Sequence, residues 1–429
     1  MVGQVIMFAI ATTHGPLPPC PNIPPTISMP LDPQQDFFIP SNLTYFNPAT
    51  LGPMPRAAFS CATDLWRDLS ADPAELYDWG GGPSKSRLDA VRMMTAEFLG
   101  AQTDEIELVQ STTIALNNAI DGLVSSGRLR KEQIVITTDQ EHGGGVAAYK
   151  HLVARGAVAK LETVALPAPP PSADAVVQLF AAAFAKHPAG SVGVLGVSHV
   201  LTTTGMALPL SRLAALAHAH GAMLVVDGAQ AATAVNLNVT GTGADVYATS
   251  GHKHLLGPTG SGVLYVRKSS QKYVTPTLLD GGYAGYSQSS GTAPLQTIAG
   301  LGYSLSLLSA LGGMGAVAKH NNDLAGLVYD GFASLAKELP GLHILSPARG
   351  SGLDSSLVSL QLPPTHPVPK VLHTLRKDYG MVVKHLPDHE GGTPLVYNGL
   401  RVSTHVYNSK ADVQRLMSAL RASLGLASR

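Results

Sequence analysis

The chain has 429 residues, of which 45% are hydrophobic, and its 29 basic side chains balance 29 acidic ones. This length favours two lobes over one simple core. A neutral chain without a basic run gives no electrostatic reason to expect nucleic acid or an anionic membrane as a partner. The two cysteines, Cys20 and Cys61, are too few for a disulfide framework or a cysteine-based zinc site, and we predict no metal.

The N-terminal region is expected to be an arm. Residues 2–11 are mildly apolar, but they lack a basic start and a small-residue cleavage site, and a membrane span needs roughly 20 apolar residues. Residues 15–40 are rich in proline, which favours an extended segment. We therefore expect residues 1–55 to be an arm and a segment that packs on the smaller domain, in a cytoplasmic protein.

The ordered part of the chain is expected to open with a short strand at Tyr45 and Phe46, before a loop that carries Asn47. Asn47 either contacts a substrate or caps a turn, and the pattern leaves both readings open. Helical periodicity follows at residues 56–70 and 87–100, with a glycine-rich loop at 77–83 between them.

Strand and helix patterns then alternate along the chain. Strands are predicted at 133–137, 159–166, 191–198, 223–226, 245–248 and 262–266. Helices are predicted after Ser111, after a loop at 141–145, and at 173–185 and 210–220. This alternation predicts an α/β domain with a mostly parallel sheet between helices, whose ligand lies beyond the carboxyl ends of the strands.

A second, smaller domain is expected in the C-terminal part. After a helix at 294–310, the composition changes near residues 312–315, so we place a large domain at 56–312 and a small α+β domain at 313–429. The small domain is predicted to contain helices at 319–339, 368–379 and 410–424, and strands at 356–362 and 400–406.

One lysine and one aspartate point to a cofactor. Lys253 lies in Ser250-Gly-His-Lys-His-Leu-Leu-Gly-Pro-Thr-Gly260, and Asp227 ends the apolar run that begins at Met223. Pyridoxal phosphate requires a lysine amine that holds it as a Schiff base and a carboxylate that pairs with its ring nitrogen. We therefore predict pyridoxal phosphate as the cofactor, with Lys253 and Asp227 in these two roles.

Four further features each have a functional and a structural interpretation. Thr112 and Thr113 begin a predicted helix, where free N–H groups bind phosphate, but hydroxyls also cap ordinary helices. His142, on its glycine-rich loop, either stacks on a flat ring or faces solvent. Thr202 either offers a hydroxyl to the cofactor or shapes a loop. Arg401 lies on a predicted strand and either grips a carboxylate through two parallel hydrogen bonds or lies at the surface.

Together these motifs resemble the aminotransferase class V family of fold-type I pyridoxal-phosphate enzymes. This family includes cysteine desulfurases, kynureninases and isopenicillin N epimerase-like proteins. The resemblance runs from Tyr45 to the C-terminus and rests on residues 225–230 and 250–260, supported by the Arg-Val-Ser-x-x-x-Tyr-Asn pattern at 401–408. The opening Tyr-Phe-Asn-Pro-Ala-Thr-Leu-Gly-Pro-Met-Pro55 looks most like the isopenicillin N epimerase-like branch.

The resemblance implies roles that the residue pattern leaves open. Gln230 would bond the phenolic oxygen of the cofactor, and Arg401 would anchor the substrate carboxylate. Thr292 resembles the residue that a neighbouring subunit sends to the phosphate, which implies a homodimer. The other implied cofactor contacts are His142 on the ring and Thr112, Thr113, Ser250 and His252 on the phosphate.

The departures from the family pattern bear on the reaction. Desulfurases use a cysteine on a loop upstream of the carboxylate arginine, but residues 382–392 contain none. We therefore predict that the protein is not a cysteine-nucleophile desulfurase. Position 202 is more often asparagine in the family, which weakens the expected cofactor contact of Thr202.

The resemblance implies an enzyme that generates a Cα carbanion from an amino acid, in the manner of isopenicillin N epimerase. We expect a small amino-acid-like substrate of specialised metabolism. The alternatives are a Mannich- or aldol-type cyclase that forms carbon–carbon bonds, as in fungal alkaloid pathways, and a carbon–sulfur β-lyase. A protein that only binds an amino acid is a further alternative, against which the intact Lys253, Asp227 and Arg401 argue.

Overall fold

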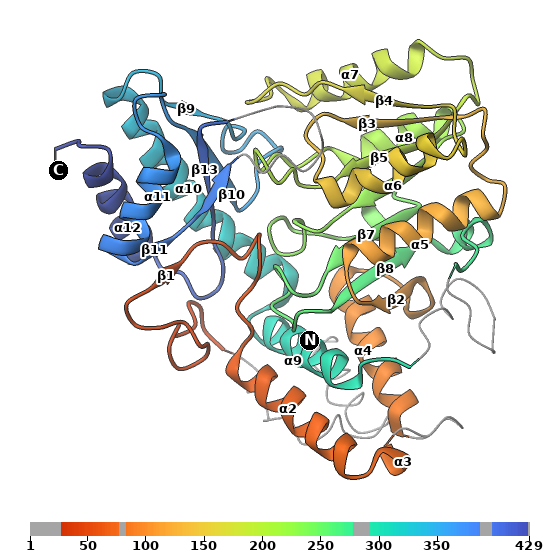
Figure 1. Cartoon of the computed structure of the whole chain (residues 1–429), viewed down its shortest axis with the longest axis horizontal. Coiled ribbons are helices and arrows are strands. Elements are labelled where there is room, and N and C mark those ends of the chain that lie inside the picture. The colour runs from red at the N-terminus through yellow and green to blue at the C-terminus, as the bar shows by residue number, and fades with distance from the viewer. Residues whose placement is uncertain (1–26, 77–82, 278–291, 387–396, 428–429) are drawn as a thin grey trace.

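The computed structural model describes residues 27–76, 83–277, 292–386 and 397–427. Its largest element is a seven-stranded sheet in the order β2-β8-β7-β6-β5-β3-β4 (Figure 1). β8 is antiparallel to both of its neighbours, and the other neighbouring pairs are parallel. The strands are β2 (Ile106–Val109), β3 (Ile134–Thr138), β4 (Lys160–Val164), β5 (Val192–Ser198), β6 (Met223–Asp227), β7 (Val246–Ser250) and β8 (Gly262–Val266).

Helices cover both faces of this sheet. One face packs on α5 (Thr112–Ser125) and α6 (Gly143–Ala154), in a cluster that contains Val225. The next residue, Val226, belongs to the cluster on the other face, because successive side chains of a strand alternate. That cluster also contains residues of α2 (Arg56–Ala71), α4 (Pro83–Leu99), α7 (Ala173–Ala185), α8 (Leu210–Ala219) and α9 (Leu295–Ala310). The predicted fold-type I architecture is confirmed.

The second sheet has four strands in the order β12-β13-β10-β9. They are β9 (His343–Ile344), β10 (Leu357–Gln361), β12 (Lys384–Leu386) and β13 (Gly399–Ser403), all antiparallel to their neighbours. Its own hydrophobic cluster contains residues of α10 (Gly313–Glu338), α11 (Val368–Tyr379) and α12 (Lys410–Ser423). The boundaries of the two domains stay a prediction.

Several predicted elements differ from those observed. The loop expected at 141–145 is mostly helix, because α6 begins at Gly143, where Nδ1 of His142 accepts the N–H of Gly144 at 3.1 Å. The helix expected from residue 319 begins at Gly313, after Gly312 adopts a left-handed conformation with φ 99°. β2 was not predicted, and β7 extends two residues past the expected end at 248, as far as Ser250. The short helix α3 spans Pro73–Leu76.

The N-terminal segment packs against the rest of the protein over its described residues 27–55. Phe37 is fully buried, and its ring lies edge-on to Tyr407 with 5.1 Å between the centroids. β1 (Thr44–Tyr45) pairs in parallel with β11 (Met381–Val382). Of the segment 15–40, which was expected to be extended because of its prolines, residues 27–40 are described, and Leu31, Phe37 and Ile39 among them are buried.

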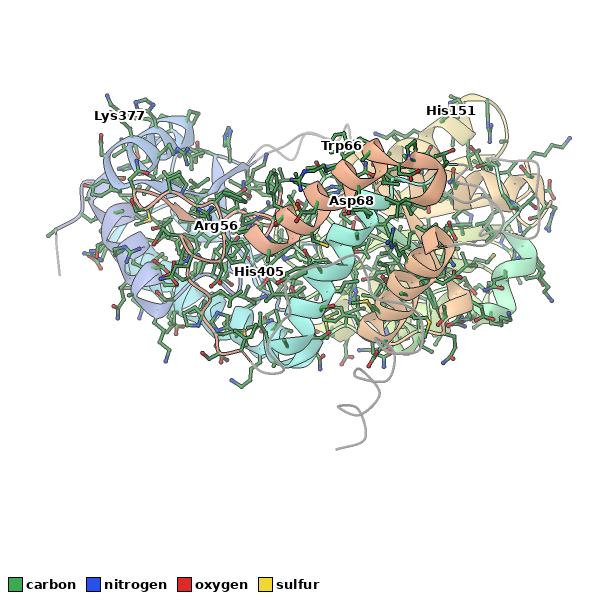
Figure 2. The ribbon with its side chains drawn as sticks, turned by 90° about the horizontal axis from the view of Figure 1, so that it is seen from below. Arg56, Trp66, Asp68, His151, Lys377 and His405 are labelled. Atoms are coloured by element: carbon green, nitrogen blue, oxygen red, sulfur yellow. The ribbon has the colours of Figure 1, made fainter. Side chains whose placement is uncertain are left out.

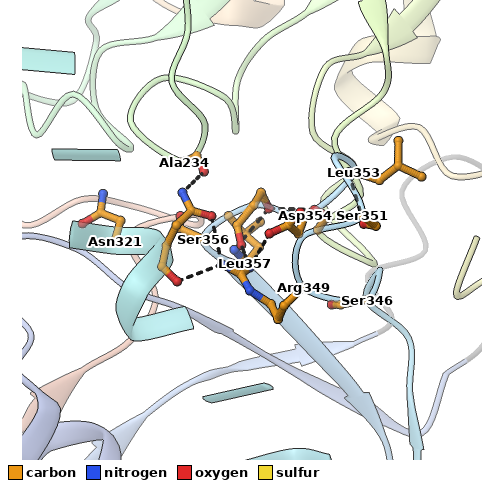
Figure 3. Close-up of polar contacts among 12 residues, drawn as sticks. Ala234, Asn321, Ser346, Arg349, Ser351, Leu353, Asp354, Ser356 and Leu357 are labelled. Carbon is orange, nitrogen blue, oxygen red and sulfur yellow. Dashed lines mark hydrogen bonds and ion pairs between the residues drawn. The ribbon is translucent and has the colours of Figure 1, made fainter. Parts of the chain in front are cut away.

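Polar contacts join the second sheet to the loop that follows β6. The carbonyl oxygen of Ala234 accepts the side-chain N–H of Asn322 at 2.9 Å and the backbone N–H of Ser356 at 3.0 Å. Arg349 holds the same region together by donating to the carbonyl oxygens of Asn322 at 2.8 Å and Ser355 at 2.9 Å (Figure 3). The contacts of Ala234 thus connect the loop after β6 to α10 and to the residue before β10.

Helix α2 carries large aromatic side chains at the surface. Phe59 is 47% and Trp66 63% exposed, and seven residues separate them, so they lie on one face of the helix. Phe38, which is 51% exposed, packs edge-on against Phe59 with 5.3 Å between the ring centroids. Figure 2 shows Trp66 along α2 at the edge of the molecule. We call Phe38, Phe59 and Trp66 the α2 aromatic surface.

Within the described residues, no single helix combines the length and apolarity of a membrane span. Only α9 and α10 taken together, with a 75° bend between them, reach that length and composition.

Candidate active site

The carboxyl ends of β3, β5, β6 and β7 and the second sheet enclose a cavity of about 290 Å³. Small-molecule sites are typically found in cavities from about this size upwards. All the predicted site residues except Asn47 and Thr292 line it: Thr112, Thr113, His142, Thr202, Asp227, Gln230, Ser250, His252, Lys253 and Arg401. Thr292 is exposed, just after the undescribed residues 278–291, so its predicted role toward a neighbouring subunit stays a prediction.

One end of the cavity is built from hydroxyls and a helix N-terminus. Ser111 caps α5 by accepting the N–H of Ile114 at 3.2 Å. The hydroxyl oxygens of Thr112 and Ser250 lie 2.7 Å apart, so the start of α5 meets the end of β7. Gly262 permits this approach, since a Cβ there would lie 2.9 Å from the backbone of Ser111. These hydroxyls and the free N–H groups of α5 form a donor set suited to phosphate.

His252 completes this end of the cavity. Its Nδ1 lies 3.0 Å from the carbonyl oxygen of Ser261, and because a carbonyl only accepts, Nδ1 carries the hydrogen. Burial lowers the pKa of His252. In the neutral ring, Nε2 therefore carries no hydrogen. Nε2 could donate to a phosphate only if the anion stabilised the protonated form of the ring.

Asp227, at the end of β6, lies against the first turn of α6. Its Oδ1 accepts the N–H of Ala229 at 2.9 Å, which fixes the carboxylate plane. A Cβ on Gly145 would lie only 2.7 Å from Oδ2, so glycine is needed for the helix to come this close. The same turn carries His142, whose ring is held through the bond to Gly144. Asp227 and His142 thus reach the cavity from adjacent elements.

Gln230 is oriented by partners on two sides. Its side-chain N–H donates to the carbonyl oxygen of Ala49 at 2.8 Å, and its Oε1 lies 3.2 Å from Nε2 of His254. Burial holds the pKa of His254 well below its usual range, so the ring is neutral, with its hydrogen on Nε2 toward Gln230. His254 was not predicted as a site residue, and only its place in the fold identifies it.

Lys253 lies on the turn after β7, and its backbone is held from both sides. The N–H of Gly52 donates to the carbonyl oxygen of His252 at 2.9 Å, and the N–H of Leu256 to that of Lys253 at 3.1 Å. A Cβ on Gly52 would lie 2.1 Å from the Lys253 oxygen. The N-terminal segment therefore packs directly against the turn that carries Lys253.

Arg401 is 1% exposed and lies in β13. Its Nη1 donates to the carbonyl oxygen of Thr202 at 2.9 Å and to its hydroxyl at 2.6 Å. Its Nη2 donates to Asn47 and Thr50 at 3.2 Å each. Thr202 and Asn47 therefore both contact Arg401. Asn47 Oδ1 also accepts the hydroxyl of Thr50 at 2.8 Å, as a turn-capping residue does. The expected contacts of Thr202 with the cofactor and of Asn47 with a substrate stay predictions.

Glu141 is a buried carboxyl beside the site that was not predicted. Its oxygens accept hydrogen bonds from Ser198 at 2.5 Å and Thr138 at 2.8 Å. Burial raises the pKa of Glu141 to about 7, and the negative charge of Asp227 adds to this rise. Its position directly before His142, at the end of a strand, was the only signal in the sequence.

The residues present fit pyridoxal phosphate in size, charge and donor pattern. Thr112, Ser250 and the start of α5 would hold its phosphate, Asp227 its ring nitrogen and Lys253 its aldehyde carbon. When bound, the cofactor withdraws electrons from the Cα of an attached amino acid. The amine of Lys253 can then accept or return a proton, and Arg401 can hold the substrate carboxylate in a fixed orientation.

Sequence comparison decides the family. The aminotransferase class-V family model matches residues 49–416. The chain belongs to this family. Membership confirms the resemblance described above and the predicted pyridoxal phosphate cofactor.

Curated relatives of this class V protein carry two kinds of name. Isopenicillin N epimerase of Amycolatopsis lactamdurans is 29% identical, over 88% of this chain and 94% of that protein. A probable cysteine desulfurase of Halalkalibacterium halodurans is 27% identical, over 89% of this chain and 93% of that protein. A cysteine desulfurase of Klebsiella pneumoniae is also 27% identical, over 88% and 92%.

Solved structures share the fold. Apo cysteine desulfurase of Thermococcus onnurineus superposes with a TM-score of 0.76 at 23% identity, covering 94% of this chain and 100% of that one. The cystine C–S lyase C-DES, solved with cysteine persulfide, has a TM-score of 0.74 at 21% identity, covering 89% and 97%.

Proposed function

We propose that this class V protein acts on the Cα proton of an amino acid, as an epimerase-type enzyme, and does not form a cysteine persulfide. The observation that carries the proposal is the position of its cysteines. Cys61 is 1% exposed in α2, packs in the hydrophobic cluster and is not a free thiol. The other cysteine, Cys20, lies outside the described residues, and residues 387–396, which follow Leu386 in the sequence, contain none.

A desulfurase needs a thiolate that reaches the sulfur of its substrate, because the thiolate is the nucleophile. No described cysteine lines the cavity. Proton transfer at Cα needs only a base, an electron-withdrawing group and a held carboxylate. Lys253, the cofactor and Arg401 meet these needs, and the relationship to isopenicillin N epimerase supports the same reaction type.

The test is to incubate the holoenzyme with a panel of amino acids in heavy water. We expect one deuterium at Cα in an otherwise intact amino acid, with inverted product seen by chiral chromatography. Lys253→Ala should lose the exchange, because the base and the covalent anchor are the same amine. Lys370→Gln, an exposed lysine on α11, should exchange like the wild type.

Three products would each overturn the proposal. Alanine formed from cysteine, with sulfur left on the protein, would establish desulfurase activity. A keto acid with ammonia would establish β-elimination, the chemistry of the carbon–sulfur lyase alternative. A new carbon–carbon bond would instead support the Mannich-type alternative.

A further inference from the structure

We propose that Glu141 is a positioning residue that acts through Asp227 and strengthens the hold of the site on the proton of the cofactor's ring nitrogen. Pyridoxal phosphate is the cofactor of the family to which the chain belongs. The inference therefore rests on the cofactor and holds whichever reaction the protein catalyses.

Glu141 lies in a row with Ser198 and Asp227 across the carboxyl edge of the large sheet. β3, β5 and β6 are neighbours in this sheet, and Glu141 follows the end of β3 by three residues. Ser198, the last residue of β5, is directly opposite Asp227, the last residue of β6. The hydroxyl of Ser198 donates to Glu141 at 2.5 Å. Because neighbouring strands are about 4.8 Å apart, Ser198 lies between the two carboxylates.

Glu141 is buried and does not line the cavity, whereas Asp227 does. The hydroxyls of Ser198 and Thr138 donate to its two oxygens, which favours the ionised form. Burial outweighs these bonds and raises the pKa of Glu141 to about 7, and the negative charge of Asp227 adds to the rise. Glu141 therefore becomes negatively charged as pH rises through about 7.

Helix α6 brings two further titratable side chains to this region. Tyr149 packs over β5, where a Cβ on Gly196 would lie 2.5 Å from its hydroxyl oxygen. Burial and the negative charges of Glu141 and Asp227 raise the pKa of Tyr149, so its hydroxyl stays neutral. His142 caps the helix and lines the cavity. Tyr149 thus adds no charge beside Asp227, whereas Glu141 does so above neutral pH.

The interaction between the two carboxylates extends to the cofactor. The charge of Asp227 makes ionisation of Glu141 harder, and by reciprocity an ionised Glu141 adds repulsion at Asp227. A protonated ring nitrogen at Asp227 supplies the positive charge that relieves this repulsion. Binding of the protonated cofactor and ionisation of Glu141 should therefore strengthen each other, and a coupling of one pKa unit changes affinity about 10-fold.

The experiment measures how tightly the cofactor-free full chain binds pyridoxal phosphate at pH 6, 7 and 8, by equilibrium dialysis. Glu141→Gln is compared with the wild type at each pH, because the amide keeps the shape of the side chain and cannot ionise. Groups common to both proteins cancel in the ratio of the two affinities. We expect the wild type to gain about 5-fold or more over the variant between pH 6 and pH 8.

Two controls separate this effect from the general loss of a buried carboxyl. Glu107 is another buried carboxyl of the same sheet, with a pKa raised to about 8, but β8 and β7 separate its strand from β6. The ratio of affinities for Glu107→Gln should stay constant with pH. The deaza analogue of pyridoxal phosphate, with C–H in place of the ring nitrogen, should show no change with pH that depends on Glu141.

Ser198→Ala gives an independent test, because it keeps the titrating carboxyl but removes a donor to its ionised form. The gain in affinity should then occur at higher pH than in the wild type. A constant ratio for Glu141→Gln, an equal change with the deaza analogue, or an unmoved gain in Ser198→Ala would each overturn the inference. None of these measurements needs turnover, so absence of Cα exchange would count against the proposed reaction alone.

Discussion

His254 and Gln230 show how one unpredicted side chain orients a predicted one. The neutral ring of His254 donates to the amide oxygen of Gln230, which turns the amide nitrogen toward Ala49 and the cavity. The same nitrogen lies 3.5 Å from the hydroxyl of Thr202, which bonds Arg401. His254 is therefore a positioning residue for Gln230, whose amide nitrogen also lies near the hydroxyl that bonds Arg401.

Replacing His254 by leucine should release the Gln230 amide. The absorbance of the bound cofactor is measured as a function of pH. We expect the midpoint of its change to shift, because the side-chain N–H of Gln230 is no longer held in one orientation. Loss of the buried bond should also lower the free energy of unfolding by about 1–3 kcal/mol. His343→Leu, on the exposed edge of β9, is the control, and an unmoved midpoint in His254→Leu would refute the role.

Glu141 should make stability depend on pH. Its pKa in the folded protein is about 7, above its ordinary 4.5, so between these values the folded state keeps a proton that the unfolded chain loses. The free energy of unfolding therefore falls as pH rises through this window, and the loss is complete above about pH 7. Each pKa unit corresponds to about 1.4 kcal/mol, which makes the effect on the order of 3 kcal/mol.

Glu141→Gln should remove this slope, because an amide does not titrate. Urea denaturation of the wild type and the variant at pH 5, 6, 7 and 8 measures the free energy of unfolding at each pH. The variant should become more stable relative to the wild type as pH increases. Other buried groups, such as Glu107, with a pKa raised to about 8 by burial, contribute equally to both proteins and cancel. If the free energies of unfolding of the two proteins differed by the same amount at every pH, the prediction would be contradicted.

The sequence predicts a site residue where a reactive side-chain type occurs within a recognisable motif. Lys253, Asp227 and Arg401 combine a reactive type with a strand end or a family pattern, and the structure brings them to one cavity. Glu141 and His254 could not be found in this way. Their positions follow from strand register and burial, which depend on residues far away in the sequence.

At the scale of elements, the close approach of α6 to Asp227 depends on a glycine in the first turn of the helix. Gly145→Ala would place a methyl group 2.7 Å from Oδ2 of Asp227, so the helix or the carboxylate must move. We expect cofactor affinity to fall about 10-fold or more, measured by equilibrium dialysis of pyridoxal phosphate, because Asp227 no longer faces the ring nitrogen correctly.

Gly326 offers a matched control for this substitution. It lies inside α10, and a Cβ there would have its nearest neighbour 3.9 Å away, an ordinary contact. Gly326→Ala should raise stability by about 0.5–1 kcal/mol through helix propensity and leave cofactor affinity unchanged. Equal affinities of Gly145→Ala and the wild type would show that the close approach is dispensable.

Regular elements were predicted well where periodicity is strong. α7 and α11 have the predicted bounds 173–185 and 368–379. The start of α6 was missed because three consecutive glycines normally favour a loop, and here the His142 cap and the approach to Asp227 outweigh that preference. β2 was missed because only four residues, with the buried Glu107 among them, carry its pattern.

At the scale of the whole molecule, we propose a homodimer, as the resemblance at Thr292 implies. The α2 aromatic surface supplies apolar area of the kind that a partner covers. Light scattering should give about twice the chain mass of 44.6 kDa for the holoenzyme. Trp66→Glu combined with Phe59→Glu should shift it toward the single-chain mass, since charges oppose burial at an interface. A single-chain mass for the wild type would rule the proposal out.

The N-terminal segment also has a consequence for how the protein is made. The hydroxyl of Ser403 donates to the carbonyl oxygen of Phe46 across 357 positions, and Ala49 and Thr50 line the cavity with Arg401. Contacts so distant in sequence form late, because a long loop must close first. During synthesis on the ribosome, the cavity is therefore completed only after β13 has emerged. Newly made chains should capture the cofactor in its final geometry only once β13 has left the ribosome.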